Sequence, residues 1–190
     1  MKSERVSKVA KTKHVALLRG INVGGKNMLP MKELVGMFVA AGCRDVTTYI
    51  QSGNVVFSAD AKVVAGLGSV IAARVEERFK LRIPVVLRTA AEMERVIRGN
   101  PFLLEEAGEE MVHVCFLADL PDADKVAGLD AGRSAPDAFA LVGREIYMRL
   151  VKGVSGTKLT NAYFDSRLKT VSTMRNWRTV LKLAEMMAGA

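Results

Sequence analysis

The stretch DVTTYIQSGNVVFSA, residues 45–59, contains two short runs rich in β-branched and aromatic residues, with three polar residues between them. The runs cover residues 45–50 and 54–59, and Gln51, Ser52 and Gly53 separate them. Glycine supplies the positive φ angle that a tight reversal requires, so the pattern predicts an antiparallel β-hairpin. A sheet that contains this hairpin is antiparallel at that point.

The elements on either side of the hairpin complete a recognisable order. Pro30 suits the first turn of a helix, and Asp60 suits the cap of another. Apolar residues at helical spacing follow both positions, and apolar runs suggest a strand at each end. The expected elements are a strand at 14–20, a helix at 30–42, a helix at 61–79 and a strand at 83–89. The order βαββαβ predicts a ferredoxin-like unit.

The second half of the sequence predicts a similar order of elements. We expect a helix that ends near Gly99, a strand at 111–118, a short helix at 121–130, a hairpin around Gly143, and helices at 158–168 and 174–188. The predicted fold class is therefore α+β, with two ferredoxin-like subdomains whose antiparallel sheets are packed by helices. Their expected bounds are a basic flexible arm at 1–13, a first subdomain at 14–90 and a second at 91–190.

Composition agrees with a soluble globular protein. The chain has 190 residues, 49% of them hydrophobic and 25% charged, which is enough for one sizeable core or two small ones. We expect no membrane association and a cytoplasmic location, because no apolar run approaches the roughly 18 residues of a membrane span. Cys43 and Cys115 lie in apolar surroundings without metal-type spacing, so both are predicted to be buried free thiols.

The net charge of +8 is concentrated at the start of the chain. Residues 1–13 carry five lysines and arginines against one glutamate, a net of +4, which leaves +4 for the rest. Such an arm is able to contact nucleic-acid backbones without sequence preference. A solubilising tail without a partner is the alternative.

Several stretches resemble the domain-of-unknown-function family numbered 1697. They are LLRGINVGGKNMLPMKEL (17–34), TYIQSGNVVFSA (48–59), NPF (100–102), TKLT (157–160) and TMRNWRTVLKL (173–183). The resemblance extends from about His14 to Met187 and implies two ferredoxin-like subdomains packed together, with no established activity. The chain departs from the family pattern in its basic N-terminal extension, at Met28, where a basic residue is common, and at Thr157, where serine is usual.

The loop RGINVGGKN, residues 19–27, is one residue short of a nucleotide-binding phosphate loop. Asn27 occupies the position of the hydroxyl that would hold Mg²⁺, and Pro30 indicates a helix that begins about four residues late. The antiparallel hairpin also argues against the parallel sheet that such loops require. An apolar strand that ends at Asp119 is the one feature that favours a nucleotide-dependent enzyme, which we keep as an alternative.

Four polar stretches, 19–27, 51–54, 157–158 and 175–176, are rich in cations and amides and contain no carboxylates. Thr157 and Thr173 are predicted N-caps, which would place Lys158 and Arg175 in the first turns of two helices. A cation there opposes the helix dipole unless an anion lies between it and the exposed N–H groups. The pattern favours an anionic or phosphate ligand, and side chains extended into water are the alternative. The candidate ligand-binding residues are Arg19, Asn22, Lys26, Asn27, Gln51, Ser52, Asn54, Lys158, Arg175 and Asn176. Whether they form one pocket stays open.

Catalytic machinery is not visible in the sequence. His14 and His113 both lie in apolar strands, and Trp177 lies on a helical apolar stripe, so all three are expected in the core. We therefore predict no catalytic residue, no metal site and no cofactor, and favour a small anion-binding or accessory protein over an enzyme. Pairing of exposed sheet edges into a homodimer is compatible with this fold.

Overall fold

The computed structural model describes residues 12–103 and 108–188. Most of the predicted basic arm, residues 1–11, lies outside the described residues, whereas Thr12 and Lys13 are the first residues of strand β1. Among the helices of the described part, none is both long and apolar enough to cross a membrane.

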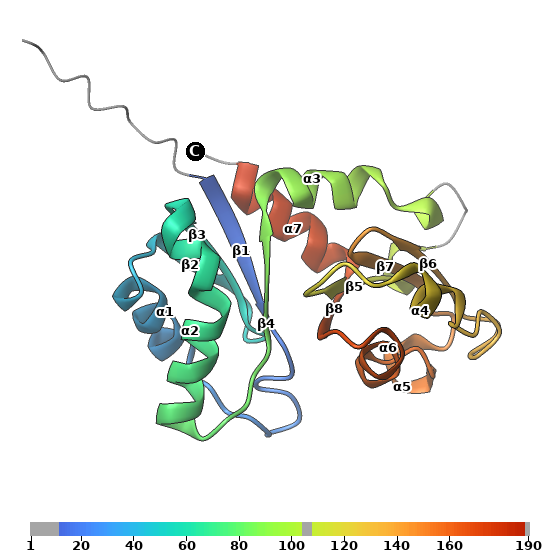
Figure 1. Cartoon of the computed structure of the whole chain (residues 1–190), viewed down its shortest axis with the longest axis horizontal. Coiled ribbons are helices and arrows are strands. Elements are labelled where there is room, and N and C mark those ends of the chain that lie inside the picture. The colour runs from blue at the N-terminus through green and yellow to red at the C-terminus, as the bar shows by residue number, and fades with distance from the viewer. Residues whose placement is uncertain (1–11, 104–107, 189–190) are drawn as a thin grey trace, which may run out of the picture.

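Two four-stranded antiparallel sheets form the framework (Figure 1). The first unit contains β1 (Thr12–Leu18), α1 (Met31–Ala40), β2 (Arg44–Tyr49), β3 (Asn54–Ala59), α2 (Ala61–Phe79) and β4 (Val85–Thr89), with strand order β2-β3-β1-β4. The second contains β5 (Val112–Leu117), α4 (Ala123–Ala127), β6 (Ala138–Val142), β7 (Glu145–Arg149), α5 (Gly153–Gly156), α6 (Asn161–Leu168) and β8 (Ser172–Asn176), with order β6-β7-β5-β8. Helix α3 (Ala90–Arg98) follows the first unit, and α7 (Trp177–Ala188) follows the second. The predicted α+β class and the two ferredoxin-like units are confirmed.

The hairpin that decides the fold forms as predicted. Strands β2 and β3 pair in an antiparallel register that places Tyr49 opposite Asn54. Gly53 in the turn has a φ angle of 76°, and a Cβ atom there would lie 2.7 Å from the Cβ of Leu18. The turn therefore requires glycine both for its backbone conformation and for its close approach to β1.

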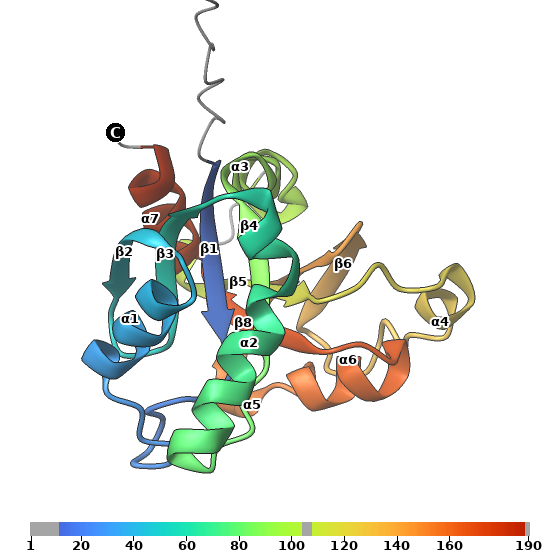
Figure 2. The same cartoon turned by 60° about the vertical axis from the view of Figure 1, so that its left-hand side comes forward.

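Helices cover the outer face of each sheet. Figure 2, turned so that α1 and α2 come forward, shows both helices lying across the first sheet. Leu34 and Phe38 of α1 and Leu67 and Ile71 of α2 are buried there. On the second sheet, α6 supplies the buried Phe164 to the equivalent cluster.

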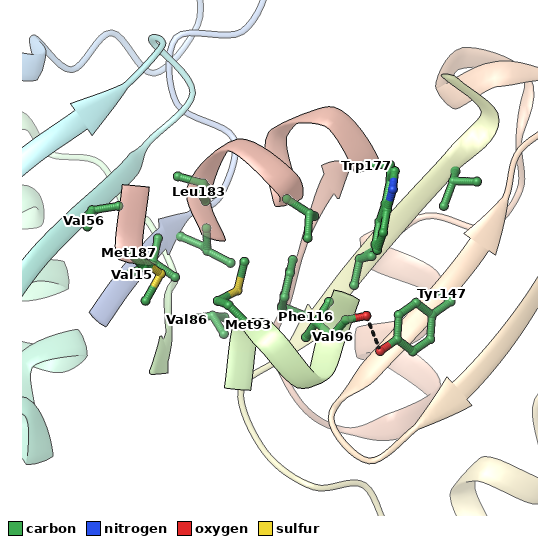
Figure 3. Close-up of a cluster of buried hydrophobic side chains, with 14 of the residues drawn as sticks. Val15, Val56, Val86, Met93, Val96, Phe116, Tyr147, Trp177, Leu183 and Met187 are labelled. Carbon is green, nitrogen blue, oxygen red and sulfur yellow. Dashed lines mark hydrogen bonds between the residues drawn. The ribbon is translucent and has the colours of Figure 1, made fainter. Parts of the chain in front are cut away.

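The inner faces of the two sheets share a third core, into which α3 and α7 are packed. Figure 3 shows Val15 of β1 and Phe116 of β5 in one cluster with Met93 of α3. Trp177, at the start of α7, is 1% exposed, which confirms its predicted core position. The Tyr147 hydroxyl donates a hydrogen bond of 3.1 Å to the carbonyl of Val96 in α3. The two units are thus joined by a continuous hydrophobic interior.

One strand near the C-terminus was not predicted. We expected helices at 158–168 and 174–188, but the structure has α6 at Asn161–Leu168, strand β8 at Ser172–Asn176 and α7 from Trp177. The sequence STMRN lacks the alternation of apolar residues that identifies a half-buried strand. Its polar side chains at Ser172 and Thr173 are nevertheless buried. The Ser172 hydroxyl donates to Asp165 of α6, and the Thr173 hydroxyl accepts from Arg175 of the same strand.

The cysteine prediction is confirmed. Cys43 and Cys115 are both buried free thiols. Burial raises the pKa of Cys115 to about 12, so this thiol is neutral at physiological pH.

Candidate functional site

Two buried arginines occupy equivalent positions in the two units. Arg88 is the next-to-last residue of β4, and Arg175 is the next-to-last residue of β8. Each is followed by a residue whose side chain caps the next helix: Thr89 accepts a hydrogen bond from the backbone of Glu92, and Asn176 accepts one from that of Thr179. The two halves can therefore be compared position by position.

Arg88 reaches from the first unit into the second. Its Nη2 donates to the carbonyl of Leu117, at the end of β5, at 2.6 Å, and to that of Arg144, in the β6–β7 turn, at 3.2 Å. Its Nε donates to the Glu145 carboxylate at 2.8 Å. The buried charge of Arg88 is thus neutralised by an ion pair.

Arg175 makes the reciprocal contacts from the second unit into the first. Its Nη2 donates to the carbonyl of Leu18, at the end of β1, at 2.7 Å, and to that of Ser52, in the β2–β3 turn, at 3.1 Å. Its Nε donates to Oδ1 of Asn54 at 2.6 Å, and its Nη1 donates to Oγ1 of Thr173 at 2.8 Å. Asn54 stands where the other half has Glu145, so the hydrogen-bond partners of Arg175 are all neutral.

The charge of Arg175 persists at neutral pH. Burial lowers the pKa of its guanidinium to about 10, which still leaves the group protonated at pH 7. A buried cation whose hydrogen bonds all go to neutral groups is costly unless an anion lies nearby. The two equivalent arginines therefore differ in their counter-charge: Arg88 has Glu145, and Arg175 has neutral partners.

A cavity of about 600 Å³ lies beside Arg175, between the two units. Its walls come from the β1–α1 loop and the β2–β3 turn of the first unit and from residues 154–162, the end of β8 and the start of α7 of the second, with His113 of β5. We call it the Arg175 cavity. Within residues 12–103 and 108–188, its lining includes two arginines, Arg19 and Arg175, and no aspartate or glutamate.

The β6–β7 turn and α3 of the other half carry an ion pair that the Arg175 cavity lacks. There, Arg144 of the β6–β7 turn forms an ion pair with Glu92 of α3. The corresponding positions beside the Arg175 cavity are Gly53, directly before β3, and Thr179, three residues after the capping Asn176. Since Gly53 has no room for a side chain, no arginine enters from this turn.

Four of the ten candidate residues line this cavity: Arg19, Ser52, Arg175 and Asn176. The structure thus joins parts of three polar stretches that the sequence left separate. Lys26, Gln51 and Lys158 are exposed and do not line it.

The remaining candidates use their side chains to hold loops. Asn22 Nδ2 donates to the carbonyls of Leu29 and Gln51 at 2.9 Å, and Asn27 Nδ2 donates to that of Gly20 at 2.8 Å. Asn54 Nδ2 donates to the hydroxyl of Ser52 at 2.9 Å, besides accepting from Arg175. These amides shape the cavity wall and are already occupied by the fold.

The predicted helix starts were wrong. The side chain that caps α6 is Thr160, which accepts from the backbone of Tyr163, and not Thr157. Helix α7 begins after Asn176, and Thr173 is a strand residue whose hydroxyl accepts from Arg175. Lys158 therefore precedes its helix and Arg175 belongs to β8, so neither cation opposes a helix dipole from a first turn.

The true helix starts nevertheless meet at the cavity. Thr160 and Asn161 at the start of α6, and Asn176 and Thr179 at the start of α7, all line it. The amino-terminal ends of helices carry partial positive charge. Two such ends add to the charge of Arg175 in the same space.

Arg19 adds no net charge to the cavity. Its Nη1 donates both to the carboxylate of Asp165 in α6 and to the carbonyl of Ser172, the latter at 3.1 Å. The ion pair with Asp165 neutralises it and ties the β1–α1 loop to α6. The formal charge of the cavity is therefore the +1 of Arg175.

The histidines were predicted as core residues, and both are buried. The contacts of His14 are structural. Its Nδ1 forms a hydrogen bond of 2.8 Å with the carbonyl of Thr12, and its ring stacks on Phe57. His113 bonds through Nδ1 to the carbonyl of Met111 at 3.2 Å, but it also lines the cavity. Because a carbonyl only accepts, the proton lies on Nδ1. Burial lowers the pKa of His113, which favours the neutral ring.

The phosphate-loop geometry is not formed. Lys26 donates its backbone N–H to the carbonyl of Val23 at 3.0 Å, which closes a tight turn, and α1 begins only at Met31, after Pro30, as predicted. Strand β1 is antiparallel to both neighbours. Asp119 accepts a hydrogen bond from Thr170 and does not line the cavity. Within the described ranges, no group of three or more histidine, cysteine or acidic side chains is placed to hold a metal ion.

Sequence reasoning missed Ile50, Thr160 and Asn161 as cavity residues. Ile50 ends an apolar strand pattern and carried no polar signal. Thr160 is part of the TKLT stretch, but the sequence argument places the helix cap at Thr157 and so does not consider Thr160 as a helix start.

The fold and the cavity together define an α+β protein of two ferredoxin-like units with a cationic cavity between them. The chain belongs to the family described as protein of unknown function (DUF1697), whose model matches residues 11–147. The stretches TKLT and TMRNWRTVLKL, which border the cavity, lie beyond that match.

Among solved structures, the chain is similar to a conserved bacterial protein, SP0830, from Streptococcus pneumoniae. The two share 24% sequence identity and a TM-score of 0.72, over 94% of this chain and 99% of that one. This similarity concerns the fold alone. No curated protein gives a significant match.

Proposed function

We propose that this chain is a binding protein for a small anionic ligand, which it holds in the Arg175 cavity. The observation that carries the proposal is the buried charge of Arg175, whose hydrogen-bond partners are all neutral, beside a cavity to which the described part of the chain contributes no acidic lining residue. A bound anion would supply the counter-charge that Glu145 supplies to Arg88. The reduced, buried thiols favour a cytoplasmic location.

Arg175 acts in this proposal through its charge. A guanidinium has five N–H donors, and those of Arg175 are engaged by Asn54, Thr173 and backbone carbonyls. Direct hydrogen bonds to the ligand come instead from neighbouring hydroxyls. Ser52 and Thr173 each accept a hydrogen bond from another side chain, which leaves their own protons to donate.

The test is a thermal-shift and calorimetric titration with sodium acetate and with inorganic phosphate on wild type and Asn176→Asp. Aspartate is as good a cap as asparagine and nearly isosteric, so the helix start is kept while the cavity gains a negative charge. At a separation of about 6 Å and an effective dielectric constant of about 20, the added repulsion is about 3 kcal/mol. Solvent screening reduces this to a loss of about tenfold in affinity.

Two controls separate the site from general charge effects. Lys26→Gln lowers the net charge by the same amount outside the cavity and should leave anion affinity unchanged. Thr160→Asp should weaken binding, whereas the neutral cap Thr160→Asn should not. If acetate and phosphate fail to bind wild type, or bind Asn176→Asp as tightly, the proposal is wrong.

A further inference from the structure

The mouth of the Arg175 cavity is aliphatic although its floor is polar. Val23 of the β1–α1 loop is 62% exposed, Ile50 of the β2–β3 turn 53%, and Val154 of α5 56%. All three line the cavity, and they come from both units. Exposed apolar side chains that gather around one polar cavity are typical of a surface that a ligand covers.

Ile50 is held in an unfavourable backbone conformation. Its φ angle is 48°, in the left-handed region. A β-branched residue is rarely found there, whereas glycine and asparagine adopt this conformation readily. The turn would therefore form more easily with another residue at position 50. An exposed isoleucine in this place serves neither the core nor the turn, and strained residues of this kind gather at binding sites.

The charge of the cavity sets the charge of its ligand. The Arg19–Asp165 pair contributes no net formal charge, so Arg175 carries the formal charge that is left to be matched among the described lining residues. One negative charge matches it. A phosphate monoester carries about −1.5 to −2 at pH 7, which exceeds the formal charge of Arg175.

We propose that the ligand is an aliphatic monocarboxylate, an inference that rests on the anion-binding function proposed above. The carboxylate lies on the floor, near Arg175, where the hydroxyls of Ser52 and Thr173 donate to it. The hydrocarbon chain extends toward the mouth and covers the side chains of Ile50 and Val154. The cavity volume of about 600 Å³ lies within the usual range for small-molecule sites.

The experiment is isothermal titration calorimetry of the full chain with acetate, butanoate, hexanoate, octanoate, inorganic phosphate and hexan-1-ol. Full burial of a methylene tightens binding by about fourfold, so an open mouth should give about twofold to fourfold for each methylene added. Hexanoate should bind at least about tenfold more tightly than hexan-1-ol, because the alcohol lacks the charge that Arg175 attracts.

Ile50→Asn tests the mouth, because asparagine accepts the left-handed conformation and keeps the turn. We expect this variant to lose most of the gain in affinity with chain length. Val39→Asn is the matched control, since Val39 of α1 is 55% exposed and does not line the cavity.

The outcomes distinguish the two proposals. If acetate and phosphate bind but octanoate binds no more tightly than acetate, the aliphatic ligand is refuted while anion binding stands. The same conclusion follows if Ile50→Asn keeps the full chain-length dependence. If hexan-1-ol matches hexanoate, the charge of Arg175 does not select the ligand and both proposals are refuted. If no anion in the series binds, both proposals fall together.

Discussion

Replacing Arg175 by methionine should cost a large part of the stability of the fold. Methionine keeps much of the apolar stem but removes the donors to Leu18, Ser52 and Asn54, three acceptors of the first unit. A buried acceptor left without a partner costs about 1–3 kcal/mol, so the gross loss is about 3–9 kcal/mol. Removal of a buried charge offsets part of this, and the net loss should be about 3–5 kcal/mol.

Equilibrium urea unfolding of Arg175→Met and wild type measures this difference directly. Arg178→Met is the control, because Arg178 is an exposed arginine three residues further along the chain, and it should change the free energy of unfolding by less than about 0.5 kcal/mol. A domain of this kind has a total stability of about 5–15 kcal/mol, so the expected loss is easily resolved. A loss below about 1 kcal/mol for Arg175→Met would show that its contacts do not join the two units.

Three further predictions concern stability. Trp177→Ala should lower the free energy of unfolding by about 3–5 kcal/mol in the same assay, because the indole is 1% exposed between the sheets. Gly53→Ala should lower the melting temperature, since alanine resists a φ of 76° and its Cβ would lie 2.7 Å from the Cβ of Leu18; an unchanged temperature would contradict this. Burial lowers the pKa values of His14 and His113 in the folded chain below the ordinary 6.5, so the unfolded chain binds more protons as pH falls. Stability should therefore be fully present above about pH 6.5 and decline below it, and the double variant His14→Gln, His113→Gln should show a smaller decline in urea unfolding between pH 7 and pH 5.

The fold was predictable where the signals were local. The hairpin around Gly53 depends on turn chemistry and strand propensity, both of which are written in a few adjacent residues. Trp177 lies on an apolar stripe that shows its burial directly. Strand β8 was missed because its burial comes from β5 and from hydrogen bonds of Arg175, neither of which leaves a pattern in the residues 172–176.

The cavity was predictable in part. The polar stretches named Arg19, Ser52, Arg175 and Asn176 as candidate binding residues and left open whether they form one pocket; the structure places all four at one cavity. For Arg175 the supporting argument about helix starts was wrong. Arg175 bonds to Asn54 rather than to a carboxylate. This difference becomes significant only by comparison with the other half, where Glu145 occupies the equivalent place beside Arg88. Such a comparison needs the two halves superimposed in space, because their sequences are too different to align by themselves.

The most direct test of the central claim is an amide nuclear magnetic resonance titration of the protein with acetate. The equivalent place in the other half provides an internal control: Leu87 and Leu117 both accept hydrogen bonds from the neutralised Arg88, and Ala118 directly follows Leu117. Binding at the Arg175 cavity predicts saturable shifts at the amides of Ser52, Thr160 and Asn176 and none that saturate at Leu87 and Ala118. Shifts of equal size in both halves, or none that saturate at the three cavity amides, would contradict it.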